Sequence, residues 1–349
     1  MSTSTRPART NRAHRIVGGT LALLLGLAGP AAASAAPAPA EEAGASPLAV
    51  TGYVIQWARP AVVRRDADAL TTATVAGVEI ARDGASVGTS TRAARRLLRT
   101  ARGSGLRAEL ILSNYSERVG GFDTRAADRL LRSAENRDRV VDSVVDQVVG
   151  QGWDGVNVDL EALRARDAHG LVALLRALDD RLPADREVSI DVSARTSEQS
   201  YRDAGYRLSA IGEAVDVFQL MAYDLHGPTW SRPGPIGPLD WQRRAAEVVL
   251  GSVPAGKLDL GVAGYGYRWT GRLTGRSLTV SQARAAVERA GVEARYDGEA
   301  GEWTATLPGG DVLWWSDARS YELRRELATA LGLHGVALWR LGSADRLVA

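Results

Sequence analysis

Short apolar runs alternate with amphipathic segments along most of the chain. Where the apolar residues recur three and four positions apart, they predict helices over residues 92–101, 137–151, 169–182, 241–253 and 321–333. The apolar or alternating runs between them fit buried strands. These predicted strands cover residues 52–57, 74–80, 107–113, 155–161, 187–193, 216–224, 258–266 and 335–341.

Eight strands that alternate with helices predict an α/β fold with a parallel sheet, closed into a (β/α)8 TIM barrel. A doubly wound open sheet is the alternative, but no G-x-G-x-x-G follows the first run, which counts against a dinucleotide-binding version. Residues 270–318 are too long for a simple connection and contain one helical pattern followed by short strand-like runs. They predict a small α+β insertion between the seventh and eighth strands.

The amino-terminal segment lacks this alternation. Four arginines, at positions 6, 9, 12 and 15, precede a short apolar run and then small residues suited to cleavage, so residues 1–35 are predicted to be a signal peptide. The run is too short to span a membrane, although a retained anchor is the alternative. Residues 36–49 form an Ala/Pro-rich linker before a domain over residues 50–349. We expect a secreted, extracellular or cell-wall-associated protein with no membrane contact after cleavage.

The amino-acid composition limits the kinds of reactive site and partner that the protein can have. The 349 residues include no cysteine, which excludes disulfides and thiol nucleophiles, and only four scattered histidines, which argue against a metal site built from histidine. The formal charge is +2, but without residues 1–35 the chain has 39 basic and 41 acidic residues. The charge therefore gives no support to a nucleic-acid partner. We expect the protein to act as a monomer.

The stretch DGVNVDLE, residues 154–161, places polar groups on one face of a predicted strand. Residues two apart share a face, so Asn157, Asp159 and Glu161 point toward the barrel axis, with Glu161 nearest the carboxyl-terminal mouth where barrel enzymes keep their active sites. Burial of such groups is costly unless they are paired or functional. A structural hydrogen-bond network and a divalent-metal site are the alternatives, and the amide of Asn157 weakens the second because it replaces an anionic ligand.

DGVNVDLE resembles the signature D-x-x-D-x-D-x-E of glycoside hydrolase family 18, the chitinase family. Asp154, Asp159 and Glu161 match this signature, and Asn157 departs from its second Asp. An asparagine at this position of the signature is also similar to the branch that contains spore-germination and cortex-lytic N-acetylglucosaminidases. We therefore do not interpret Asn157 as a loss of activity.

Further similarities follow in the family's order. MAYDLHG, residues 221–227, ends the sixth predicted strand and is similar to the family's M-x-Y-D. ALWRLG, residues 337–342, supplies the Trp expected at the end of the eighth strand. Residues 233–269 resemble the cortex-lytic branch. The resemblance covers about residues 50–345.

The resemblance implies a glycoside hydrolase that cleaves β-1,4 bonds next to N-acetylglucosamine, in chitin or peptidoglycan-type polysaccharides. The implied mechanism is retaining and substrate-assisted, so the substrate's own acetamido oxygen is the nucleophile and neither a metal nor a cofactor is expected. Glu161 is the implied acid and base, Asp159 holds the acetamido N–H, and Tyr223 donates to the acetamido oxygen. The implied substrate-binding residues are Asn157, Met221, Asp224 and Trp339.

A non-catalytic protein of the same fold that binds chitin or another polymer of N-acetylglucosamine is the alternative function. Such relatives typically lack the acid at position 161, whereas this chain has it. Nine Trp against two Phe agree with sugar binding in either case, because sugars stack on large aromatic faces. Asn114 and Tyr115, just past the third predicted strand, are weaker candidates at the mouth.

Overall fold

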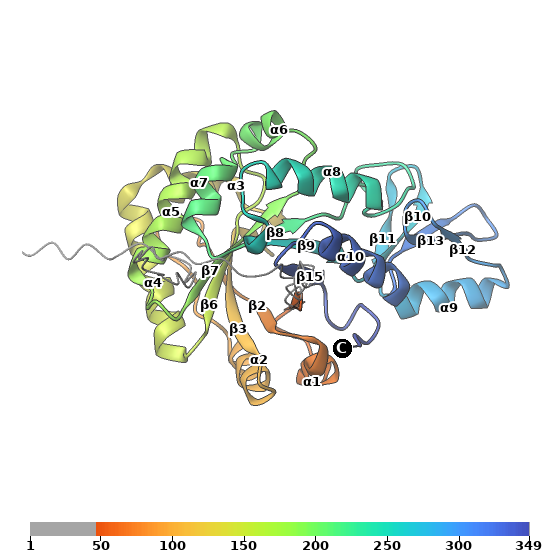
Figure 1. Ribbon diagram of the computed structural model, residues 1–349, viewed down its shortest axis with the longest axis horizontal. Helices are drawn as coiled ribbons and strands as arrows, with labels where there is room; N and C mark the ends of the chain where they lie inside the picture. The colour runs from red at the N-terminus through yellow and green to blue at the C-terminus, as the bar shows by residue number, and fades with distance from the viewer. Residues whose placement is uncertain (1–46, 349) are drawn as a thin grey trace, which may run out of the picture. The chain divides into compact units, whose positions relative to one another are not determined.

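The structure, a computed structural model, describes residues 47–348. The predicted signal peptide and most of the predicted linker lie outside the described residues. Eight parallel strands form a closed barrel (Figure 1) in the order β1-β15-β9-β8-β7-β6-β3-β2. The barrel prediction is confirmed and the open sheet is excluded. The strands are β1 (Ala49–Val54), β2 (Thr72–Glu79), β3 (Arg107–Ser113), β6 (Gly155–Asp159), β7 (Glu187–Ser193), β8 (Val217–Met221), β9 (Leu258–Ala263) and β15 (Gly335–Trp339).

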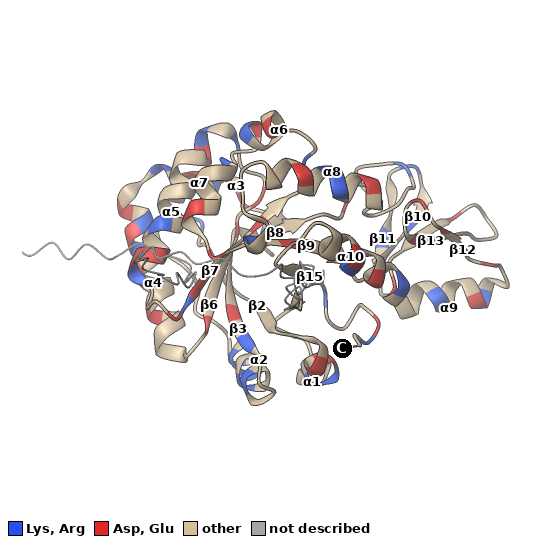
Figure 2. Cartoon of the chain, in the orientation of Figure 1, with Lys and Arg blue, Asp and Glu red and all other residues tan. Residues whose placement is uncertain are grey.

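Helices cover the outside of the barrel, and their buried faces carry the predicted apolar repeats. The five predicted helices correspond to α2, α4, α5, α8 and α10, whereas four shorter ones were not predicted because they span too few turns to show a period. Figure 2 shows acidic and basic residues mixed along the outer helices. The helices are α1 (Pro60–Asp66), α2 (Arg92–Gly103), α3 (Thr124–Arg132), α4 (Ala134–Gln151), α5 (Ala168–Arg181), α6 (Glu198–Asp203), α7 (Leu208–Ala214), α8 (Leu239–Leu250) and α10 (Ala318–Ala330).

The turn from α4 into β6 aims the signature stretch into the barrel. Gly152 ends α4 with a left-handed φ of 80°, a conformation that glycine adopts without steric cost. Its N–H donates to the Val148 carbonyl, which satisfies a free acceptor at the helix end. Within residues 47–348, no helix combines the length and the apolar character that crossing a membrane requires.

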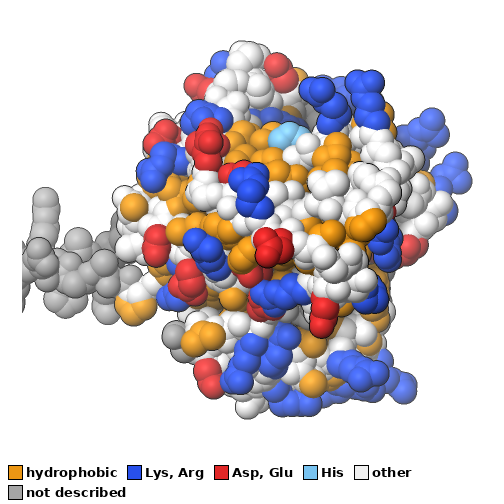
Figure 3. Space-filling view, turned by 90° about the vertical axis from the view of Figure 1, so that its right-hand side faces the viewer, with side chains coloured by type: hydrophobic (Ala, Val, Ile, Leu, Met, Phe, Trp, Pro, Cys, Tyr) orange, Lys and Arg blue, Asp and Glu red, His pale blue; other side chains and the backbone are white. Residues whose placement is uncertain are grey.

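A lobe, residues 266–315, stands between β9 and β15. It holds a five-stranded antiparallel sheet in the order β11-β10-β14-β13-β12, with α9 packed on it around a small apolar core. Figure 3, which faces the lobe side of the molecule, shows basic side chains scattered around apolar ones. The lobe's elements are β10 (Gly266–Gly271), β11 (Thr274–Leu278), α9 (Val280–Ala290), β12 (Arg295–Asp297), β13 (Glu302–Thr306) and β14 (Val312–Trp315).

The lobe begins earlier than the pattern indicated. Residues 258–269 are almost continuously apolar or glycine, so no polar break marks the end of the barrel strand. In the structure β9 ends at Ala263, and β10 starts at Gly266 inside the run assigned to the seventh strand. The side chains of Tyr265, Tyr267 and Trp269 enter a separate apolar cluster near the barrel mouth.

Candidate active site

Two hollows open at the carboxyl-terminal ends of the barrel strands and share one wall. The Trp57 half, about 490 Å³, is lined by Asp159 and Trp339 among others, and the Trp230 half, about 470 Å³, by Trp230 and Arg195 among others. Residues from the ends of several strands meet here, as expected for a barrel active site. The shared wall consists of Glu161, Met221, Tyr223 and Asp224.

Glu161 is held between the two halves by its own backbone. β6 ends at Asp159, yet the alternation continues, because Leu160 is buried on the outer side and Glu161 is half-buried at the mouth. Asn114 grips the backbone of Glu161 twice: its Oδ1 accepts from the Glu161 N–H at 2.9 Å and its Nδ2 donates to the Glu161 carbonyl at 3.1 Å. Asn114 thus positions the candidate acid.

The side chain of Glu161 is suited to hold a proton. Its Oε2 accepts only a long hydrogen bond, 3.4 Å, from the Ser193 hydroxyl. Burial, followed by the nearby Asp159, raises the pKa of Glu161 well above its ordinary value. A protonated carboxyl at the junction of two hollows can act as a general acid toward a bond that lies across it.

Asp159 presents an acceptor that the protein leaves free. Its Oδ2 accepts from the Ser113 hydroxyl at 3.0 Å, whereas its Oδ1 is buried without a hydrogen-bond partner. Burial raises the pKa of Asp159 to about 6, against the lowering effect of the Ser113 hydrogen bond. A buried acceptor without a donor costs about 1–3 kcal/mol, which a ligand N–H would recover.

Asp224 and Tyr223 complete the shared wall. Asp224 has a left-handed φ of 64°, and its Oδ1 accepts from the hydroxyls of Tyr265 and Tyr267, the latter at 2.9 Å. Enclosure by the protein raises the pKa of Asp224, and the two hydroxyls lower it. Tyr223 meets Tyr265 edge to face at 6.3 Å, and burial raises the pKa of Tyr223, so its hydroxyl remains a donor.

Aromatic rings line the floor and the rims. Trp339 is half-buried at the end of β15, with its ring centroid 5.5 Å from that of Tyr53. Trp57 is 65% exposed beside one half and Trp230 is 51% exposed beside the other. Such faces suit ligands with C–H surfaces, sugars among them.

A polar network lies beneath the site, inside the barrel. Asn157 is fully buried, lines neither half and donates to the hydroxyl of Ser189 at 3.0 Å. Ser189 in turn donates to Glu109 at 3.1 Å. The structure therefore places Asn157 among the supporting residues, because it lies two positions below Asp159 in the barrel, and not among those that face a ligand.

Asp191 was missed by the sequence interpretation. It lies on β7, is 3% exposed, and lines the Trp57 half. Its signal was the stretch EVSIDVS, residues 187–193, which alternates polar and apolar residues like the signature stretch. Tyr53, whose hydroxyl donates to Asp191, and Ser113 were also missed, since an isolated hydroxyl in an apolar run carries no pattern.

The donor set does not favour a metal. Among residues 47–348, no three histidine or acidic side chains gather in an arrangement that could hold a metal ion. The unpaired Oδ1 of Asp159 belongs to a residue that lines the same hollow as Tyr223 and Trp339, and such an aromatic lining suits an organic ligand with an N–H better than a cation.

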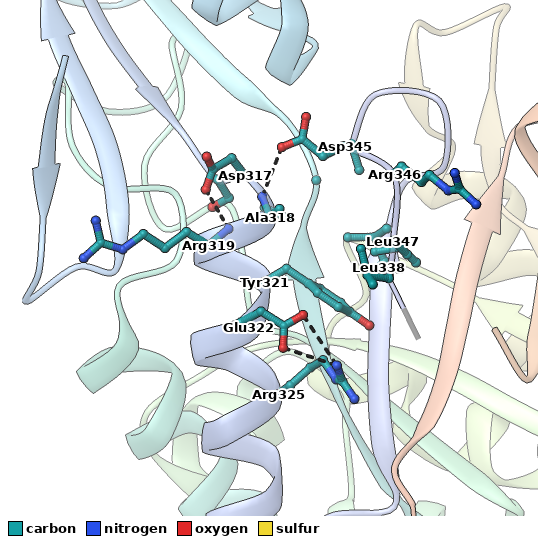
Figure 4. Close-up of a pocket in the computed structure, with 15 residues that line it drawn as sticks. Asp317, Ala318, Arg319, Tyr321, Glu322, Arg325, Leu338, Asp345, Arg346 and Leu347 are labelled. Carbon is teal, nitrogen blue, oxygen red and sulfur yellow. Dashed lines mark hydrogen bonds and ion pairs between the residues drawn. The ribbon is translucent and has the colours of Figure 1, made fainter. Parts of the chain in front are cut away.

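A further hollow, about 460 Å³, lies between α10 and the carboxyl-terminal segment (Figure 4). The Asp345 carboxylate accepts from the Ala318 N–H at 3.2 Å, and Arg325 pairs with Glu322 at 3.2 Å. None of the predicted site residues lines it, and Asp345 and Arg325 are already paired, with Arg284 and Glu322. It is therefore not the candidate site.

Comparison with known proteins points to one family. The family model described as "Glycosyl hydrolases family 18" matches residues 50–344. The sporulation-specific glycosylase YdhD of Bacillus subtilis (strain 168) is 31% identical over 233 residues, which cover 64% of this chain and 55% of YdhD. The cortical fragment-lytic enzyme of the same strain is 27% identical over 247 residues, covering 67% of this chain and 56% of that enzyme.

A solved structure agrees over more of the chain. The chitinase from Chromobacterium violaceum ATCC 12472 superposes with a TM-score of 0.78 at 27% identity, covering 85% of this chain and 95% of that one. The chain spans about half the length of the two curated relatives that it matches.

Proposed function

The chain belongs to glycosyl hydrolase family 18, and we propose that it is a secreted glycosidase that cleaves β-1,4 bonds next to N-acetylglucosamine. The observation that carries this proposal is the pairing of Glu161, a carboxyl with a raised pKa between two hollows, with Asp159, a buried acceptor without a donor. The first suits the protonation of a glycosidic oxygen. The second suits an acetamido N–H.

The proposed mechanism retains configuration and uses the substrate as nucleophile, as this family does in departing from the two-carboxylate scheme. Glu161 gives its proton to the glycosidic oxygen while the acetamido carbonyl oxygen attacks C1, so the C1–O bond breaks and an oxazolinium ion forms. Asp159 accepts the acetamido N–H through Oδ1 and stabilises the positive charge. Glu161, now a carboxylate, takes a proton from the water that attacks C1, which restores both the acid and the β-configuration.

The remaining wall residues would orient the sugar. The Tyr223 hydroxyl donates to the acetamido oxygen from the side opposite Asp159, and Asp224 accepts from a sugar hydroxyl. Trp339 forms the apolar floor under the sugar at the point of cleavage, with Met221 beside it. The exposed rings of Trp57 and Trp230 would stack sugars farther along each half.

The polymer and the location follow as further parts of the proposal. Two relatives are named for sporulation or for cortical fragments, which favours a peptidoglycan-type polysaccharide, and the structural neighbour is named a chitinase, which favours chitin. Residues 1–35 would direct export, which gives the enzyme access to either polymer.

The test is incubation of the mature protein with chitin oligosaccharides and with purified peptidoglycan, followed by mass analysis of the products. A matched set of de-acetylated oligosaccharides tests the nucleophile. We expect cleavage of acetylated substrates only, with the β-configuration retained. Efficient cleavage of the de-acetylated set would overturn substrate assistance, and binding without products would favour a non-catalytic protein.

A further inference from the structure

We propose that Asp191 is a positioning residue that keeps Glu161 protonated, supplying from β7 the second acid that the family signature carries at position 157 of β6. The inference rests on the proposed function, because the group that Asp191 serves is the acid of that reaction. It concerns the one position at which this chain departs from the signature.

Strand register sets Asp191 opposite Asp159. β6 and β7 are parallel, with Asn157 opposite Ser189 and Val158 opposite Ile190. The paired register ends there, and Asp159 and Asp191 are the next residues of the two strands, which lie about 4.8 Å apart; both line the Trp57 half. Two carboxyl groups thus face the same space at the height of the reaction.

Asn157 and Asp191 fit each other as they stand. The Asn157 amide donates to Asp191 Oδ1 at 3.0 Å, and the Tyr53 hydroxyl donates to the same oxygen. A carboxylate at position 157 would turn this donor into a second acceptor against Asp191. The acid that the signature carries at position 157 is therefore found on the neighbouring strand β7, as Asp191. The asparagine at position 157 donates a hydrogen bond to it.

Donors to a carboxylate favour its charged form, so the acid with the weakest donors is the last of the three to ionise. Asp191 accepts from two donors, Asp159 from one, and Glu161 from one long hydrogen bond. Glu161 is thus the last to lose its proton. Each earlier ionisation places a negative charge beside it and strengthens its hold on that proton.

Titratable and polar groups reach Asp191 from every neighbouring strand, and burial together with Asp159 raises its pKa. Asp191 in turn acts on Glu161: the pKa of Glu161 is raised first by burial, then by Asp159 and then by Asp191. The groups around Asp191 are Tyr53 from β1, Glu109 from β3, Asn157 and Asp159 from β6, and Gln219 from β8, with Tyr223 above.

The test compares Asp191→Asn, Asn157→Asp and the double swap, with carboxyl 13C NMR titration of Glu161 and the pH dependence of kcat and KM as readouts. We expect Asp191→Asn to lower the Glu161 pKa and the basic limb of the profile by about one pH unit, since one like charge within reach is lost. The shift of the limb and of the Glu161 titration, and not the size of kcat, is the result that tests the proposal. The double swap should move both readouts back toward the wild-type values.

Ser189→Ala is the matched control: it removes an uncharged partner of the same Asn157 and one donor to Glu109, but no charge, so the limb should stay in place. A Glu161 titration that is the same in Asp191→Asn and wild type overturns the proposal, as does a double swap that behaves like Asp191→Asn. The NMR titration needs no turnover. If the wild-type protein cleaves no acetylated substrate while Asp191→Asn still lowers the Glu161 pKa, the proposed function is contradicted and the role of Asp191 is supported.

Discussion

Two groups of buried ionisable side chains in this protein differ in how fully their charges are matched by partners. One is the cluster of Asp159, Glu161 and Asp191 at the barrel mouth, where three acids converge and one carboxylate oxygen has no donor. The other is the ion pair of Arg324 on α10 and Glu302 on β13, whose side chains are 1% and 0% exposed and 3.3 Å apart. Both groups bury ionisable groups, which is expensive unless they are paired.

The ion pair is compensated by its surroundings. Arg324 donates to the carbonyls of Gly237, Ala300 and Gly301, at 2.6, 3.0 and 2.5 Å, and Glu302 accepts from two backbone N–H groups. The acids of the cluster have few such donors. A fully matched network fixes structure, whereas an unmatched one holds groups ready for a ligand, and this difference separates the architectural from the catalytic use of buried charge.

The catalytic role of the acid cluster is tested most directly at Glu161. Glu161→Gln keeps the shape of the side chain but removes its proton, so kcat on acetylated substrates should fall by about 10²–10⁴-fold with binding nearly intact. Thermal stability should not fall, because no donor is lost and the neutral amide avoids the cost of keeping a buried carboxyl protonated. The control is Glu198→Gln, an exposed acid on α6. Full activity of Glu161→Gln would remove this residue from the mechanism.

In the ion pair the expected loss is one of stability. Arg324→Met leaves Glu302 buried and unpaired, so the free energy of unfolding should drop by about 3–5 kcal/mol in urea denaturation. Arg325→Met, on the same helix, removes a partly exposed pair with Glu322 and should cost at most about 1 kcal/mol. Equal losses in the two variants would mean that the buried Arg324–Glu302 pair contributes no more to stability than the partly exposed Arg325–Glu322 pair.

A pH titration of stability examines the acids below the site. Burial raises the pKa of Glu109 from 4.5 to about 7, so the folded state holds a proton that the unfolded state has lost between these values. Stability should therefore fall as pH rises from about 4.5 to 7, and be flat outside that window for this group, by up to about 3 kcal/mol. Glu109→Gln should make the fall shallower, as measured by denaturation at several pH values. An unchanged slope would show that Glu109 ionises normally.

The smallest expected effect concerns a single hydroxyl. Tyr223→Phe removes one donor to the acetamido oxygen and should lower kcat about fivefold, in line with one hydrogen bond of about 1 kcal/mol. Steady-state kinetics on a chitin oligosaccharide measures it. A loss as large as that of Glu161→Gln would mean that Tyr223 takes part in proton transfer.

Much of the barrel could be predicted because it depends on local patterns. The alternation in residues 155–161 and 187–193 indicates which side chains face the axis, and the signature stretch identifies Asp159 and Glu161. The partners were harder to find. Asn114 was only a weak candidate, from its place just past the third predicted strand. Its two hydrogen bonds to the Glu161 backbone, and the one from Ser113 to Asp159, follow from no spacing in the sequence.

The matched ion pair was wholly unpredicted, for a related reason. Glu302 and Arg324 look like ordinary charged residues in their own segments, and only the fold brings them together with the backbone around Gly237. The end of β9 was misplaced because apolar character continues into β10. Sequence pattern therefore located the elements, while tertiary contacts decided which charges are buried.

The two tyrosines that donate to Asp224 have a consequence for engineering. Tyr267 is the second residue of β10 and Tyr265 stands just before it, so the lobe's first strand is also part of the wall of the site. A chimera that exchanges lobes at Gly266 would separate these donors, and one that discards β13 would strip Arg324 of its counter-ion. The lobe is therefore not an independent module: a grafted lobe must supply a tyrosine and a glutamate equivalent to Tyr267 and Glu302, and the host barrel must keep Tyr265.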